Sequence, residues 1–131
     1  MAEYIHYQDY YTNEFLVNYK KVKDFINFLE QNGYTDESKI YHLFRLMFKS
    51  ACQLIKYFLN NNGLFQFSES DVLKEACYIE LIDNGDEWFE LLELYNINEE
   101  NSEKIRNIFK KNFFIIDELK NKMDGYINNV T

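Results

Sequence analysis

The chain has 131 residues, a net charge of −8 and a pI near 4.7, and 47% of its residues are hydrophobic, with 12 Phe and 11 Tyr. A chain of this length and composition can bury a core as one domain, which excludes an intrinsically disordered segment. There is no proline and there are only four glycines, so long helices are favoured over a many-stranded sheet, and the negative charge disfavours nucleic acid as a partner.

The first helix is predicted from apolar residues that recur at spacings of three and four before a stop at Asn32-Gly33. Its apolar face consists of Phe15, Tyr19, Val22, Phe25, Ile26 and Leu29. The polar, Tyr-rich residues 1–10 before it are expected to form a flexible end.

The second helix is predicted to be the longest, with about 25 residues and a length of about 38 Å at a rise of 1.5 Å per residue. Residues 35–38 offer a choice of N-caps, and Asn62-Gly63 ends the helix. Its apolar positions are Ile40, Phe44, Met47, Phe48, Ala51, Leu54, Ile55, Phe58 and Leu59.

A shorter third helix is predicted to start at Ser68, which forms with Asp71 a pattern close to a capping box. Asn84-Gly85 is expected to end it. Its apolar face consists of Val72, Leu73, Ala76 and Ile79.

The fourth helix is short and is predicted to open at Asp86-Glu87, because acidic side chains are favourable at a helix N-terminus. It ends near Asn96. One face carries Trp88, Leu91, Leu92 and Tyr95.

The last helix is predicted to be capped by Asn98, with Glu99 and Glu100 in its first turn, and residues 127–131 are expected to be a flexible end. Its apolar stripe is Ile105, Ile108, Phe109, Ile115, Ile116, Leu119 and Met123. The helices and their short connections predict one domain over residues 1–131, an all-α, antiparallel up-and-down four-helix bundle with a short extra helix.

Residues with chemical potential are few and isolated. Cys52 and Cys77 lie in apolar helical stretches and are predicted to be buried thiols in a reducing compartment. His6 and His42 have no neighbour at metal-binding spacing, so structural or surface roles are favoured. We expect no catalytic residues, metal or cofactor. With no signal peptide pattern and no long apolar run, we expect a cytoplasmic protein outside the membrane.

Acidic residues are concentrated in the middle of the chain. Residues 69–103 contain twelve Asp and Glu and a single base, Lys74. This block is either a solvated face of the third and fourth helices or a docking surface for a basic partner, which would speed association. Trp88, inside the block, is either a core residue or an interface anchor. The predicted partner-binding residues are Glu87, Trp88, Glu90, Tyr95 and Asn96.

The stretch IYHLFRLMFKSACQLIKYFLNNNG has spaced Phe residues, then Ala, Ile, Lys and Leu before a Gly. Ser68 and VLKEACYIELIDNGDEWFELLE follow, with a Leu-Ile-Asp turn and a short helix that carries Trp. In their order and spacing, over roughly residues 15–123, these features resemble the HepT-like family, also called nucleotidyltransferase substrate-binding proteins. The resemblance implies a cytoplasmic helical bundle, commonly dimeric, that pairs with a small nucleotidyltransferase.

Toxin members of that family carry an Arg, four to six residues and a His after the short helix, which implies cleavage of RNA, and a nearby Tyr that the transferase modifies with AMP. Here the segment reads ELLELYNINEENSEKI, with Tyr95 where the Arg is expected, and both histidines precede Arg45 and Arg106. The ribonuclease motif is therefore broken, which favours a non-enzyme. Arg45 and Lys49, four residues apart, are predicted to form a solvated basic strip.

Three hypotheses follow. The first is a non-catalytic HepT-like binding subunit for a minimal nucleotidyltransferase. The second is a diverged HepT-type ribonuclease toxin of a toxin-antitoxin pair that uses other residues, with Tyr95 and Asn96 as remnants of the old site. The third is a free-standing interaction or inhibitor protein from a mobile element. The identity of the partner, a nucleotide ligand and the oligomeric state are left open by the sequence.

Overall fold

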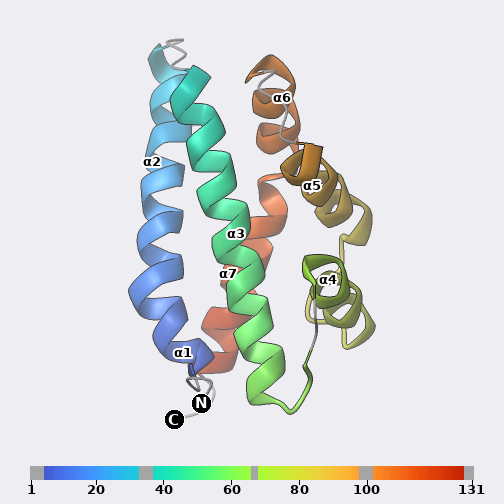
Figure 1. Cartoon of the computed structure of the whole chain (residues 1–131). Coiled ribbons are helices and arrows are strands. Elements are labelled where there is room, and N and C mark those ends of the chain that lie inside the picture. The colour runs from blue at the N-terminus through green and yellow to red at the C-terminus, as the bar shows by residue number, and fades with distance from the viewer. Residues whose placement is uncertain (1–4, 33–36, 66–67, 98–101, 129–131) are drawn as a thin grey trace.

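The computed structural model describes residues 5–32, 37–65, 68–97 and 102–128, and these ranges are helical almost throughout, without a strand (Figure 1). The prediction of an all-α protein is confirmed. The elements are α1 (Tyr7–Tyr10), the π-helical η1 (Tyr11–Phe15), α2 (Leu16–Asn32), α3 (Glu37–Asn61), α4 (Glu69–Tyr78), α5 (Gly85–Ile97), α6 (Ser102–Asn112) and α7 (Phe114–Asn128).

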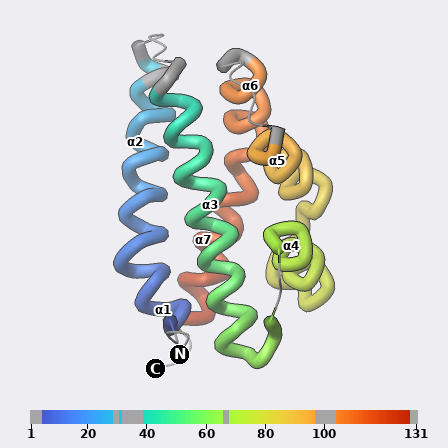
Figure 2. The backbone as a smooth tube through the Cα atoms, in the orientation of Figure 1, coloured from blue at the N-terminus to red at the C-terminus, as the bar shows by residue number. Residues whose placement is uncertain are grey.

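Three long rods dominate the arrangement. The first is α1, η1 and α2 in one line, and it runs antiparallel to α3 (Figure 1). α6 and α7 follow one another behind α3 and run in the same direction as α3 (Figure 2). The short helices α4 and α5 lie on the far side of α3 from α2, at a steep angle to the rods. α3 is central, because it contacts α1, α2, α4, α5 and α6.

The predicted apolar face of α3 is confirmed as the centre of the core. Phe44, Met47, Phe48, Leu54 and Ile55 are each exposed by 1% or less. Of the predicted positions on this helix, Phe58 alone is half-buried. The helix ends at Asn61, before the predicted stop at Asn62-Gly63. The φ of Gly63, +82°, is free of steric cost for glycine, and Leu64 N–H donates back to Leu59 C=O.

The first helix begins at Tyr7, eight residues before the predicted Phe15, so the described part of the expected N-terminal flexible end is mostly helix. Tyr7 and Tyr11 are 9% and 3% exposed. Aromatic residues recur there every four positions up to Tyr19, and on a regular α-helix each such step would drift by about 40°. The wider turn of η1 offsets this drift and keeps the rings facing the core.

Side-chain contacts hold this early start in place. The His6 side chain accepts a hydrogen bond from Gln8 N–H. Asn61 at the end of α3 accepts from Tyr7 N–H at 2.7 Å and donates to Ile5 C=O at 3.0 Å. The spacing of apolar residues does not indicate these polar contacts, which is why the predicted start of the helix is wrong.

α4 ends at Tyr78, well before the predicted stop at Asn84-Gly85. Glu80 adopts the left-handed conformation, with φ +62°, and Leu81 N–H donates to Ala76 C=O, which completes a Schellman motif without glycine. The chain turns there, so Leu81 is buried at 1% exposure while the predicted core residue Ile79 is 38% exposed. Ser68 caps the other end as predicted, accepting from Asp71 N–H.

The predicted last helix is two helices, α6 and α7, with a break at Phe113. The core side of the break holds Asn112, which is fully buried, and Phe113, which is 5% exposed. A buried amide at a core position was absent from the predicted stripe. All residues of that stripe are buried except the half-buried Ile108.

Several predicted features fall outside the described residues. They are the side chains at the Asn32-Gly33 stop, the N-caps within residues 35–38, and the Asn98 cap with Glu99 and Glu100. Of the expected flexible end at 127–131, Ile127 and Asn128 belong to α7 and the rest is outside the described ranges.

Candidate functional site

α5 presents four carboxylates on its outer side, Asp86, Glu87, Glu90 and Glu93, which we term the acidic face. The helix places them there because its other side is buried, with Leu91 fully buried. Three of the four are spaced by four and three residues, which brings them onto one strip of the helix surface. Asp86 and Glu93 are exposed, and Glu87 and Glu90 are half-buried.

An open groove of about 440 Å³ lies along this face. Its lining consists of Asp86, Glu87, Phe89, Glu90, Glu93 and Lys111. Four acids, one base and one half-buried aromatic ring make the groove negative, with an apolar surface beside the charges. Such a groove complements a Lys or Arg side chain, whose charged end and apolar stem meet both kinds of surface.

Glu90 differs from the other three acids because its carboxylate has partners within the protein. Its carboxylate accepts a hydrogen bond from Asn112 Nδ2 at 2.6 Å and lies 3.8 Å from Lys111 Nζ. Asn112 is fully buried, and its Oδ1 atom has no hydrogen-bond partner among the residues that the structure describes. Within the described part of the chain, Asp86, Glu87 and Glu93 form no ion pair, so their charges face solvent.

Trp88 is 1% exposed and lies against Phe48 of α3, with ring centroids 6.5 Å apart. The structure therefore shows Trp88 as a core residue. A buried ring cannot contact a partner in this conformation, so Trp88 leaves the predicted set of surface residues. Its effect on the acidic face is indirect: it anchors α5 to the core.

Tyr95 and Asn96, at the end of α5, lie apart from the groove lining. The Arg45 guanidinium lies 4.0 Å from the Tyr95 ring and donates to Tyr95 C=O at 2.9 Å. It is also 5.6 Å from the Tyr41 ring. A cation at a helix C-terminus is favourable, and the last turn of α5 has no base of its own.

Arg45 is thus a clamp between α3 and α5, and the predicted solvated strip is wrong for this residue. Lys49, its predicted companion, is exposed as expected. The two lie one turn apart, and Arg45 is the one whose guanidinium lies over the Tyr95 ring. No local sequence signal indicates this, because the contact joins residues fifty positions apart.

A second, smaller pocket of about 50 Å³ lies between α3, the start of α4 and Tyr95. It is lined by Phe48, Lys49, Cys52, Gln53, Lys56, Ser68, Glu69, Val72 and Tyr95. This volume holds water rather than a nucleotide. Burial raises the pKa of the Cys52 thiol far above its usual value, so the thiol is a core group and not a nucleophile at neutral pH.

The remaining candidate residues have ordinary surroundings. Cys77 is half-buried rather than buried, and burial followed by the Asp83 charge raises its pKa. His6 caps α1, and His42 is exposed on α3. The described ranges hold no group of three or more His, Cys, Asp or Glu suited to a metal ion. They also hold no helix with the length and apolarity that spanning a membrane requires.

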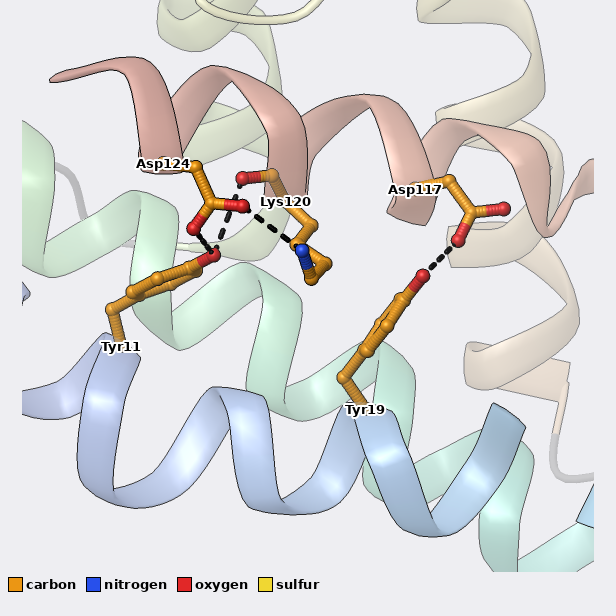
Figure 3. Close-up of polar contacts among 5 residues, drawn as sticks. All are labelled: Tyr11, Tyr19, Asp117, Lys120 and Asp124. Carbon is orange, nitrogen blue, oxygen red and sulfur yellow. Dashed lines mark hydrogen bonds and ion pairs between the residues drawn. The ribbon is translucent and has the colours of Figure 1, made fainter. Parts of the chain in front are cut away.

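A second set of carboxylates lies on α7, where it faces η1 and α2 (Figure 3). Tyr11 donates to Asp124, which also lies 2.9 Å from Lys120 Nζ. Tyr19 donates to Asp117, which lies 3.2 Å from Lys23 Nζ. We term these six residues the tyrosine seam. Its pairs were missed from the sequence because the partners are about a hundred residues apart.

The seam joins α7 to η1 and α2 through hydrogen bonds and ion pairs. Burial, then the hydrogen bond to Asp124 and its charge, raise the pKa of the Tyr11 phenol, and burial and Asp117 do the same for Tyr19. Both phenols therefore stay protonated at neutral pH and act as donors. Burial raises the pKa of Asp124, but the hydrogen bonds from Tyr11 and Lys120 and the Lys120 charge outweigh it and hold this pKa below its usual value.

No family model matches the chain, and comparisons with curated proteins and with solved structures give no match either. The resemblance to the HepT-like family thus stays a prediction from the motifs.

Proposed function

We propose that this protein is a non-catalytic binding subunit that docks a basic partner protein on the acidic face of α5. The observation that carries the proposal is the open groove. Its lining consists of four carboxylates, Phe89 and one basic residue, Lys111. Carboxylates that face solvent on a well-anchored helix attract a basic partner and speed its association.

The class of partner is inferred from the resemblance: a small nucleotidyltransferase. We also infer the finer fold that this implies, a four-helix bundle in which α4 and α5 together replace one rod. Its support is that α4 and α5 lie between the second and third rods along the chain, and that these two rods run in the same direction, as a returning segment between them would require (Figure 1). A homodimer is part of the same inference.

The test is co-expression of this chain with the nucleotidyltransferase encoded nearest to its gene, followed by measurement of the complex at low and high salt. The double variant Asp86→Lys/Glu93→Lys should weaken the complex by at least tenfold. The control, Asp9→Lys/Asp24→Lys, makes the same change in net charge at exposed positions of α1 and α2. Equal effects of the two variants would refute the docking site, and the absence of any complex would remove the transferase as partner.

A diverged ribonuclease is a second candidate, because α3 brings the Arg45 guanidinium to Tyr95. Arg45 contacts the Tyr95 ring, and His42 stands three residues before Arg45 on the same helix. Growth arrest upon expression that is lost in His42→Ala and in Asn96→Ala would support this candidate. Arrest unchanged by both substitutions, or no arrest at all, would count against it.

A further inference from the structure

The end of α4 carries two exposed apolar side chains next to one another. Tyr78 is 83% exposed and Ile79 is 38% exposed. With Glu80, which has the left-handed backbone described above, they form what we term the knuckle. Tyr78 faces outward because the buried side of α4 is set by Val72, Leu73 and Ala76, and position 78 is about 200° around the helix from Ala76.

The knuckle is held rigidly by its surroundings. The Schellman hydrogen bonds fix the turn, and Leu81 and Ile82 directly after it are 1% and 5% exposed. From α7, Lys122 Nζ donates to Glu80 C=O at 3.0 Å and to Asp83 at 3.2 Å. The exposed tyrosine therefore stands on a fixed base, and binding through it would cost little conformational entropy.

The backbone at Glu80 is strained, and a glycine at this position would adopt the same conformation without strain. A left-handed conformation is costly for a residue with a side chain, and the same motif at the end of α3 uses Gly63. Strain of this kind concentrates at functional positions. Here it turns the chain immediately after Tyr78 and Ile79, so that both stay outside the core.

Acidic residues lie around the knuckle: Glu75 precedes it, Glu80 is part of it and Asp83 follows. Asp83 is paired with Lys122, and Lys74 is exposed next to Glu75, so the acids named here exceed the bases by one. The knuckle also adjoins the acidic face: a Cβ placed on Gly85 would lie 3.3 Å from Cys77 Sγ, so the end of α4 touches the start of α5.

We propose that the knuckle is the apolar anchor of the docking surface, with Tyr78 and Ile79 packing against apolar side chains of a partner protein that also presents Lys or Arg to the acidic face. Tyrosine is enriched among the interface residues that contribute most to binding. The basic side chains of the partner rest on the proposed function, since they take the acidic face as the surface that the partner neutralises. The anchor itself rests on exposure and rigidity.

The experiment is selection of random 12-residue peptides, displayed on phage, against the immobilised full-length chain, with affinities then measured for wild type and variants. The selected peptides should combine Lys or Arg with a large apolar residue. Tyr78→Ser should weaken their binding by on the order of tenfold or more. Phe65→Ser, which removes another exposed aromatic ring at 75% exposure, should leave it unchanged.

Peptides that bind Tyr78→Ser as tightly as wild type, or a selection that enriches none, would overturn the anchor. Thermal melting of Tyr78→Ser checks the fold, and an unchanged midpoint is expected because the side chain is exposed. The variant Asp86→Lys/Glu93→Lys separates the two proposals. If the peptides bind this variant normally but bind Tyr78→Ser weakly, the anchor is supported and the acidic face is refuted. If they bind Tyr78→Ser normally but bind this variant weakly, the anchor alone is refuted.

Discussion

The tyrosine seam and the acidic face use the same carboxylate chemistry in opposite ways. In the seam, Asp117 and Asp124 each accept a phenol hydrogen bond (Figure 3), and each also pairs with a lysine. On the acidic face, Lys111 pairs with Glu90, and the other three carboxylates form no ion pair among the described residues. In the seam the carboxylates help to attach α7 to the first rod, whereas on α5 they face solvent. Along the chain, the excess of acid lies in residues 69–103, which hold twelve Asp and Glu against Lys74.

The largest expected effect comes from removing a seam ring. Tyr11→Ala deletes a side chain that is 3% exposed and leaves Asp124 without its phenol donor, so we expect a loss of about 3–5 kcal/mol in the free energy of unfolding. Tyr11→Phe keeps the ring and should cost only about 1–2 kcal/mol. Urea denaturation of the three proteins measures both values, and equal losses would show that the hydroxyl carries the whole contribution.

An intermediate effect is expected from acid. The pKa of Asp124 is lower in the folded protein than in the unfolded chain, so its contribution is complete above the unfolded value of about 4 and is lost as the pH falls through the lowered folded value. Unfolding free energies measured from pH 5 down to pH 2.5 should fall less steeply for Asp124→Asn than for wild type. Parallel curves would exclude Asp124 as a source of the acid sensitivity.

The smallest expected effect lies on the acidic face. Asp86→Asn/Glu93→Gln should change the free energy of unfolding by no more than about 0.5 kcal/mol per site, because neither carboxylate has a partner in the described part of the chain. A stabilised double variant would strengthen the contrast with the seam, since it would reveal repulsion along α5. A loss above about 2 kcal/mol would abolish the contrast between the two regions.

Local signals in the sequence predicted most of the helices. The face of α3, its glycine end and the acidic opening of α5 follow from spacing and capping preferences that act within a few residues. Trp88 was placed on an apolar face for the same reason, and its burial agrees with that. The acidic block was also visible as a run of charges, so the groove residues Glu87 and Glu90 were among those predicted.

What the sequence did not indicate are features that join distant segments or break a local rule. The Arg45 clamp on Tyr95 links α3 to α5, and the early start of α1 depends on Asn61. The left-handed residue after α4 is Glu80 rather than the usual glycine, so the sequence pattern predicts a helix that continues past it. The exposure of Tyr78 follows from that turn and was missed with it.

The π-helical turn of η1 makes the first rod sensitive to the number of its residues. Thr12, Asn13 and Glu14 are exposed, so no side-chain contact with the core opposes the loss of one of them. Such a deletion would remove the extra residue that the wider turn accommodates, and the helix could close as a regular α-helix with Tyr7 still facing the core. An insertion of one residue would instead rotate everything before it by about 100°, and Tyr7 would then leave Asn61. Substitutions at these three positions and a one-residue deletion should be tolerated, while a one-residue insertion there should detach the beginning of the rod.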